Sequence, residues 1–251
     1  MHDRIARLPR AARILSVETD NYRTKTFALD AGLDGYPGQF AMVWLPGFDE
    51  KPFSLVGVDP VRVMITAVGP CTELIHGKRA GEQLWVRGPF GHGFSPAEQS
   101  QHALLAGGGY GVAPLLWLAQ SLCGIVPRVT VVIGARNAED LLYVERFRRL
   151  AEVQTDTRLD VLVTTDDGSA GVCGVVTDVV RPEIKDSGVD AIYACGPHPM
   201  LAALRALGQA TGVPCQLSWE AYMRCGMGLC GACEVEGALL CMDGPVLHYG
   251  S

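Results

Sequence analysis

Four of the nine cysteines in this chain lie close together, and their spacing suits an iron–sulfur cluster. They follow the pattern C-x4-C-x2-C with a fourth cysteine seven residues further on, the spacing of a plant-type [2Fe–2S] site: Cys225, Cys230, Cys233 and Cys241. Three glycines between them would let the backbone approach the sulfurs and direct its N–H groups at them: Gly226, Gly228 and Gly231. We therefore predict a [2Fe–2S] cluster on these four thiolates.

Zinc is the alternative occupant of these four thiols. Structural zinc sites with four cysteines more often use two C-x2-C pairs, whereas this chain has one. A secreted disulfide scaffold would be smaller, with cysteines spread more evenly and even in number. The cysteine pattern therefore favours a reduced, cytoplasmic protein with one local metal site.

A second chemical signal is a run of glycines after an apolar stretch. Gly107 to Gly111 follow a predicted strand and precede a predicted helix, so their backbone could approach a pyrophosphate at a helix N-terminus. The match to G-x-G-x-x-G is imperfect because Val112 stands at the third position, and a plain strand-to-helix turn is the alternative. The candidate nucleotide-binding residues of this turn are Gly108, Gly109 and Gly111.

Two further turns would lie at the same edge of a parallel sheet. Cys195-Gly196 follows a short apolar strand, and the run 164–168 (TTDDG) follows another. Ligands bind outside the carboxyl ends of parallel strands, so three such turns together predict a nucleotide site. Arg136, which follows the second strand, slightly favours a cofactor with a 2′-phosphate, that is, NADP. The choice between NAD and NADP stays open.

A short run near position 50 combines a cation, an aromatic ring and a hydroxyl group. The residues are Lys51, Pro52, Phe53 and Ser54. Such a run offers a charge for a phosphate, a flat surface for stacking and a small hydrogen-bonding group. Taken alone, it is better explained as the edge of a strand.

The elements that must position these residues fall into three segments. Residues 1–98 contain about six short strands separated by turn signals, which predicts an antiparallel barrel or sandwich: 13–17, 24–29, 39–45, 53–58, 61–68 and 82–87. Residues 99–213 alternate apolar strands with helices, which predicts a parallel sheet with helices on both faces. Residues 214–251 hold the cysteine cluster. The predicted fold is therefore a β-barrel domain, an α/β domain and a small iron–sulfur module.

The composition excludes several classes of protein. The chain has 251 residues, 48% of them hydrophobic and 19% charged, which is ordinary for a folded soluble protein. A net charge of −6 provides no basic surface for nucleic acid. Residues 99–127 carry no Asp, Glu, Lys or Arg, but glycines and Pro114 interrupt the stretch, so we expect no membrane span.

In order and extent, these motifs resemble one family. A barrel with K-P-F-S, a sheet domain with GGGYGVAP and YACGPHPML, and a C-terminal CGMGLCGAC resemble the electron-transfer subunit of NAD-dependent, class 1B dihydroorotate dehydrogenase. That family is a branch of the ferredoxin–NADP reductase superfamily. The run 164–180 and the tail 241–247 are also similar to this subunit, and the resemblance covers nearly the whole chain.

The resemblance implies an FAD site in the barrel. Lys51, Phe53 and Ser54 stand where the family has Arg, an aromatic residue and Ser around the flavin, and lysine cannot form the bidentate contact of arginine. A strand segment and a following G-x-G-T turn hold the rest of FAD in the family. The strand segment matches Met64, Ile65 and Thr66; the turn matches residues 69–72, with Cys71 in place of the second glycine and Thr72 as the threonine. Cys195 matches the position that faces the nicotinamide, beside Gly196.

The resemblance also implies an electron relay rather than a complete enzyme. Electrons would pass from an FMN-containing dihydroorotate dehydrogenase catalytic subunit through the [2Fe–2S] cluster and FAD to NAD+, in pyrimidine biosynthesis. The assembly would be a heterotetramer, and no general acid–base pair is expected. Two alternatives remain: a flavin and iron–sulfur subunit of a sulfhydrogenase or ferredoxin-dependent NADP oxidoreductase, or a zinc-stabilised nucleotide-binding module without redox activity.

Overall fold

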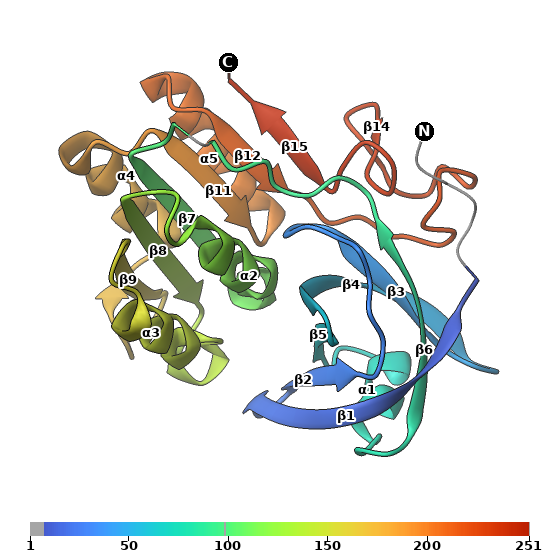
Figure 1. Cartoon of the computed structure of the whole chain (residues 1–251). Coiled ribbons are helices and arrows are strands. Elements are labelled where there is room, and N and C mark those ends of the chain that lie inside the picture. Colours follow the sequence, from blue (N-terminus) through green and yellow to red (C-terminus); the bar gives the residue numbers. More distant parts are fainter. Residues whose placement is uncertain (1–7, 98, 251) are drawn as a thin grey trace. The chain divides into compact units, whose positions relative to one another are not determined.

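A closed barrel of six antiparallel strands forms the first part of the chain (Figure 1). The computed structural model describes residues 8–97 and 99–250. The strand order is β1-β2-β5-β4-β3-β6. The strands are β1 (Arg10–Asn21), β2 (Thr24–Leu29), β3 (Phe40–Leu45), β4 (Asp49–Val58), β5 (Val61–Thr66) and β6 (Gln83–Phe90).

Alternating apolar side chains fill the interior of this barrel. Phe27 and Leu29 on β2, and Val61, Val63 and Ile65 on β5, are fully buried. Because side chains alternate across a strand, their intervening neighbours face the other side. The short helix α1 (Pro70–His76) follows β5 and opens with a proline, the residue that best tolerates the first helical position. The barrel unit comprises Met1–Gly93 together with Ala221–Pro245, which contains the hairpin β13 (Glu234–Val235) and β14 (Ala238–Leu239).

A seven-stranded sheet forms the second compact unit, Phe94–Glu220 with Val246–Ser251. Its order is β10-β9-β8-β7-β11-β12-β15, and only β15 runs antiparallel to its neighbour. The strands are β7 (His102–Gly108), β8 (Arg128–Ala135), β9 (Arg158–Thr165), β10 (Val172–Cys173), β11 (Ala191–Cys195), β12 (Cys215–Ser218) and β15 (Val246–Tyr249).

Four helices cross between these strands. They are α2 (Val112–Leu122), α3 (Val144–Val153), α4 (Val176–Ser187) and α5 (His198–Thr211), and two 3-10 turns, η1 (Gly109–Gly111) and η2 (Ala138–Asp140), precede α2 and α3. After β7 the chain moves toward β8 and β9; it then returns to β11 and β12 on the far side of β7. Right-handed crossovers therefore place α2 and α3 on one face of the sheet and α4 and α5 on the other. The direction in which successive strands are added to the sheet reverses between β7 and β11. Open α/β sheets bind ligands at such a switch point.

The predicted fold class is confirmed: an antiparallel barrel, a parallel sheet flanked by helices, and a cysteine-rich segment near the end of the chain. Helices α1 and α4 did not follow from the periodicity of the sequence. The segment 214–251 is also shared between the two units, because β12 and β15 pair with the parallel sheet whereas residues 221–245 pack with the barrel. No helix in the described parts of the chain has the length and apolar character needed to cross a membrane.

Candidate iron–sulfur and nucleotide sites

The four clustered cysteines lie in residues 225–241, which we call the cluster loop. Backbone N–H groups of this loop point at its own sulfur atoms. Met227 and Leu229 both donate to the Cys225 sulfur, at 3.4 and 3.3 Å. Gly228 donates to the Cys241 sulfur at 3.1 Å. Such donors stabilise thiolate and sulfide charge and tune the potential of an iron–sulfur cluster.

The thiols lie in two pairs within this loop. Cys225 and Cys230 are hydrogen-bonded to each other, as are Cys233 and Cys241, and the Cys241 N–H donates to the Cys233 sulfur at 3.4 Å. Within residues 8–97 and 99–250, no three His, Cys, Asp or Glu side chains are grouped so that they could hold a single metal ion. A two-iron cluster on four cysteines needs two thiolates for each iron, and two pairs meet this requirement.

The loop also favours ionisation of one of its thiols. Burial raises the pKa of Cys225, but hydrogen bonds from the N–H groups of Met227 and Leu229 and from the Cys230 thiol outweigh it and lower the pKa to about 7. Burial and the adjacent Cys233 raise the pKa of Cys241 to about 12. The thiolate is the form that binds metal, so the loop prepares Cys225 as a ligand. The donor set therefore fits an iron–sulfur cluster.

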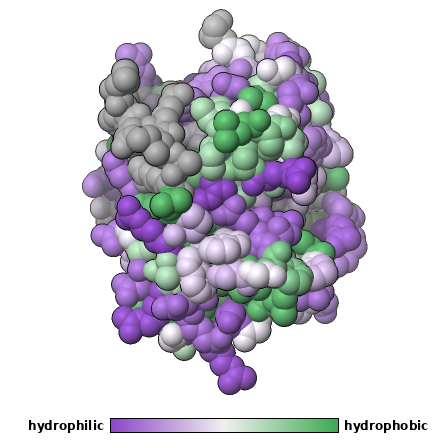
Figure 2. Space-filling model, turned by 90° about the vertical axis from the view of Figure 1, so that its right-hand side faces the viewer, coloured by the Kyte–Doolittle hydropathy of each residue, from purple (hydrophilic) through white to green (hydrophobic). Residues whose placement is uncertain are grey.

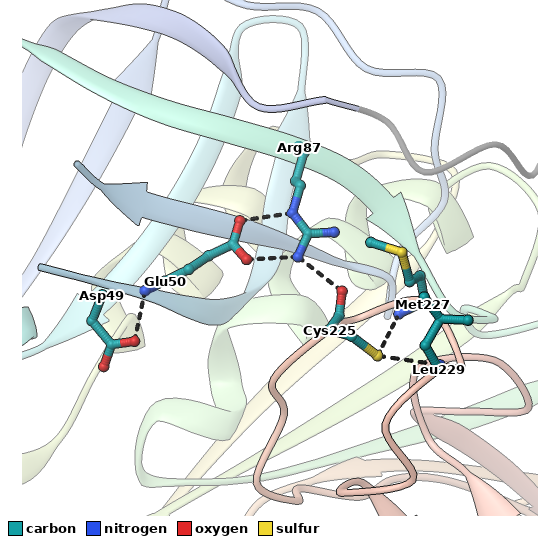
Figure 3. A network of polar contacts seen from close by, with 6 residues as sticks. All are labelled: Asp49, Glu50, Arg87, Cys225, Met227 and Leu229. Atoms are coloured by element: carbon teal, nitrogen blue, oxygen red, sulfur yellow. Dashed lines mark hydrogen bonds and ion pairs between the residues drawn. The ribbon is translucent and has the colours of Figure 1, made fainter. Parts of the chain in front are cut away.

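An arginine on β6 ties the cluster loop to the barrel (Figure 3). Arg87 donates from Nη2 to the carbonyl oxygen of Cys225 at 2.8 Å. Its Nε and Nη2 also bind the two carboxylate oxygens of Glu50 on β4, at 2.7 and 2.6 Å. Neither residue was predicted from the sequence, because the two are 37 positions apart and belong to no motif.

The predicted flavin segment lies on β4. Lys51 forms an ion pair with Asp49 at 2.6 Å, and its ammonium group lies 5.8 Å from the centre of the Tyr222 ring. The hydrogen bond that Lys51 donates to the Asp49 carboxylate raises the pKa of Lys51, so the group stays cationic. Pro52, Phe53 and Ser54 continue the strand and pair with Met42, Ala41 and Phe40 of β3.

The second part of the predicted FAD site lies on β5 and at the start of α1. Ile65 is fully buried, and its carbonyl oxygen is bound by the His76 ring, whereas Met64 and Thr66 point to the opposite face of the strand. Thr72 closes the turn: its hydroxyl accepts N–H bonds from Val68 and Gly69 at 3.0 and 3.1 Å. Cys71 is buried, which raises its pKa; the nearby charge of Asp49 raises it further and that of Lys51 opposes the shift.

The two glycine turns of the sheet unit meet at the switch point. Gly107 and Cys195 are register partners on β7 and β11. Beyond them, a Cβ at Gly108 would stand 2.8 Å from the ring of Pro197, and one at Gly196 would stand 3.0 Å from the Gly108 nitrogen. Gly109, with φ of +55°, turns the chain into α2. The structure therefore brings together the turns that the sequence predicts from two distant segments.

The third predicted turn lies away from this point. It follows β9, two strands from β7 in the sheet, and the Asp167 side chain is bound within the turn itself. Asp167 accepts the N–H and hydroxyl of Ser169, and the Ser169 hydroxyl bond in particular lowers the pKa of Asp167. Arg136, after β8, pairs with Asp140 at 3.3 Å.

Residues that the sequence analysis missed surround Cys195. Burial raises the pKa of Cys195 to about 12, so it remains a neutral thiol, and the Ser218 hydroxyl and Glu220 lie near it. Tyr110 donates its hydroxyl to Glu220 at 3.0 Å. Partial removal from water raises the pKa of Glu220, and this hydrogen bond opposes the shift. The position of these residues along the chain could have identified them. Ser218 ends β12, the strand beside β11, and Tyr110 lies inside the glycine turn.

Two family models match this sequence. Residues 104–206 match the oxidoreductase NAD-binding domain, and residues 220–251 match the iron–sulfur cluster binding domain of dihydroorotate dehydrogenase B. A protein of Thermococcus kodakarensis named a probable dihydroorotate dehydrogenase B (NAD(+)) electron transfer subunit is 40% identical over 89% of this chain and 89% of its own length. The chain belongs to the family of dihydroorotate dehydrogenase B electron transfer subunits. A relative of the same name from Methanocaldococcus jannaschii is 36% identical over 95% of this chain and 89% of its own length.

A solved structure supports the fold described above. An NADH-dependent reduced ferredoxin–NADP oxidoreductase, described for flavin-based electron bifurcation, superposes with a TM-score of 0.82 and 30% identity over 94% of this chain and 87% of that chain. The predicted family, the oxidoreductase class and the cofactors FAD, iron–sulfur cluster and NAD are confirmed at the level of the family. The two-iron form of the cluster and the individual ligand residues stay predictions.

Proposed function

We propose that this chain carries electrons from an FMN-containing dihydroorotate dehydrogenase catalytic subunit through a [2Fe–2S] cluster and FAD to NAD+. The chain and its partner would form a heterotetramer with two copies of each. The observation that carries the proposal is that the cluster loop and the flavin strand β4 belong to one compact unit. The curated relatives, named as electron transfer subunits of this NAD(+)-linked enzyme, support the same function.

Each cofactor supplies chemistry that side chains lack: the cluster carries one electron at a time, FAD stores two, and the nicotinamide accepts a hydride. The protein's own task is to bind and orient these groups. Cys225, Cys230, Cys233 and Cys241 would hold the iron. Lys51 would compensate the charge of the flavin phosphate, since Asp49 keeps it protonated.

The sheet unit would hold NAD+ at the switch point. Gly108, Gly109, Gly111 and Gly196 would let the backbone approach the dinucleotide, because none of them carries a side chain there. Cys195 would face the nicotinamide as a neutral thiol, since its pKa of about 12 keeps it from attacking the ring as a thiolate.

The partner would dock near the exposed side of the cluster loop. Cys230 is exposed, and its neighbour Leu229 is 80% exposed. Tyr222, which precedes the loop, is 66% exposed. On the face drawn in Figure 2, hydrophobic residues form separate patches bordered by hydrophilic ones. Apolar side chains beside the cluster would let the partner pack closely there, which shortens the distance that an electron must cross.

Co-expression with the FMN subunit tests the proposal. The purified complex should show flavin and iron–sulfur absorption bands and should reduce NAD+ when dihydroorotate is added. A colourless, zinc-containing chain would favour the non-redox module. The control assay supplies the complex with dihydroorotate and an artificial electron acceptor, which reports on the partner alone.

The 30% identity to a ferredoxin–NADP oxidoreductase favours a second candidate. In that case the chain would exchange electrons between a nicotinamide and reduced ferredoxin. Activity with reduced ferredoxin and NADP+, together with none from dihydroorotate although all cofactors are bound, would select this candidate.

A further inference from the structure

Arg87 is a buried cation held against the cluster loop. It is 6% exposed, and its guanidinium carbon lies 5.1 Å from the centre of the Phe90 ring. Its Nη2 binds both Glu50 and the backbone of Cys225 (Figure 3). One guanidinium group therefore joins strand β4, strand β6 and the first cysteine of the loop.

The register of the barrel explains how these groups meet. Trp44 of β3 pairs with Glu50 on one side and Trp85 on the other, and two residues along β3, Met42 pairs with Arg87. Directly opposed residues share a face of the sheet, so Glu50 and Arg87 point to the same side of β3. The loop covers this face, because a Cβ at Gly226 would stand 3.1 Å from the Met42 side chain.

Stability alone is a poor explanation for this ion pair. Removing a charge such as that of Arg87 from water costs several kcal/mol, and apolar replacements of buried ion pairs are often neutral or stabilising. Moreover, Nη1 of Arg87 is buried and has no hydrogen-bond partner among the residues that the structure describes. Figure 3 shows this nitrogen pointing away from Glu50. The guanidinium therefore keeps spare donor capacity beside the cluster loop.

We propose that Arg87 is a positioning residue that fixes the loop through Cys225 and raises the reduction potential of the cluster, with Glu50 as its counter-charge. The inference rests on the proposed function, because it needs an iron–sulfur cluster on the four thiols. Reduction adds one electron, and hence one negative charge, to the cluster. A nearby buried cation stabilises that added charge and a half-buried anion opposes it, since the protein interior screens such charges weakly.

This charge arrangement predicts opposite shifts for the two members of the pair. The test is a redox titration of the full chain followed by the EPR signal of the reduced cluster, at about pH 8, where carboxyl groups are ionised. Glu50→Gln leaves Arg87 uncompensated and should raise the potential. Arg87→Met leaves Glu50 uncompensated and should lower it. We expect each change to shift the reduction equilibrium about tenfold, which is ~59 mV for a one-electron centre. The double variant should return close to the native value.

A matched control removes an arginine whose ion pair lies on the surface of the barrel unit. Arg13 on β1 pairs with Asp30 at 3.1 Å on the surface of the same unit, and Arg13→Met should leave the potential unchanged. Arg87→Lys keeps the charge but loses the paired N–H donors of the guanidinium group. Its potential should therefore lie nearer to the native value than that of Arg87→Met, and its EPR signal should be broader.

The outcomes separate the inference from the proposed function. Shifts of the same sign, or no shift, in the two single variants would overturn the inference. If Arg87→Met fails to hold a cluster, Arg87→Lys decides, because it keeps the positive charge. A potential of Arg87→Lys about 59 mV or more below that of the native protein would then also overturn the inference. A native chain without any iron–sulfur signal would instead refute the proposed function.

Discussion

Gly111 lies directly against the carbonyl group of Cys195, so that a Cβ at this glycine would overlap the carbonyl oxygen. The two residues are 84 positions apart in the chain, one at the start of α2 and the other at the end of β11. Their contact holds the two glycine turns together at the switch point of the sheet. The proposed nucleotide site would therefore depend on the absence of a side chain at one position.

Gly111→Ala tests this contact. The added methyl group must push the two turns apart, so we expect a loss of about 1–3 kcal/mol in unfolding free energy. NADH binding should weaken at least tenfold, measured by fluorescence titration. Gly32→Ala is the control, because a Cβ there meets nothing within 4 Å. Native NADH affinity in Gly111→Ala would show that the turns do not form the nucleotide site.

The buried thiol of Cys215 should make the protein sensitive to alkali. Burial raises its pKa to about 11, from the ordinary thiol value of 9.0. Between these two values the unfolded chain releases a proton that the folded chain keeps, so rising pH favours unfolding. The contribution is fully present below pH 9 and is lost as pH approaches 11, on the order of 2–3 kcal/mol. Denaturation curves of native protein and Cys215→Ala should converge over this range; parallel pH dependence would contradict the assignment.

Gly228 connects the backbone to one of the predicted cluster ligands, Cys241. Its φ of +79° disfavours a side chain, a Cβ there would stand 2.7 Å from Met242, and its N–H binds the Cys241 sulfur. Gly228→Ala should therefore lower the iron content and the visible absorption of the cluster at least several-fold, with FAD retained. Gly237→Ala shares the backbone strain (φ +86°) but meets nothing within 4 Å, so it should keep its iron. Equal iron in both variants would remove Gly228 from the site.

Lys51 should govern how tightly the chain holds FAD. Lys51→Met removes the cation and should weaken FAD binding about tenfold or more, measured by flavin release on dilution. Lys51→Arg restores the bidentate donor of the wider family and should retain FAD at least as well as native protein. Lys78→Met, which breaks a surface pair with Glu82 in the same unit, is the control. Unchanged FAD affinity in Lys51→Met would place the phosphate elsewhere.

Local patterns in the sequence were sufficient to predict the barrel, the parallel sheet and the cysteine loop. The six strands of the barrel and the turn at Gly107–Gly111 carry signals within a few residues of one another. Helix α4 was missed because Pro182 lies inside it, and proline usually interrupts a helix. Helix α1 was missed because its seven residues are too few to show a period.

Contacts between distant segments were beyond the reach of the sequence. Arg87 and Glu50 lie on separate strands and meet across β3 only because of the barrel register. Tyr110 and Glu220 likewise meet only once β7, β11 and β12 are aligned. Such pairs have no spacing rule, since their separation in sequence depends on the lengths of the intervening loops. The structure is what identifies them as part of the candidate sites.

The variant Cys230→Ser, assembled with the FMN subunit, tests the central claim most directly. It should lose the cluster but keep FAD, so NADH should still reduce the flavin of this chain and dihydroorotate should still reduce the FMN of the partner. The relay predicts that NAD+ reduction driven by dihydroorotate then falls to the background rate. NADH formation at the native rate by a complex shown to lack the cluster would contradict the relay.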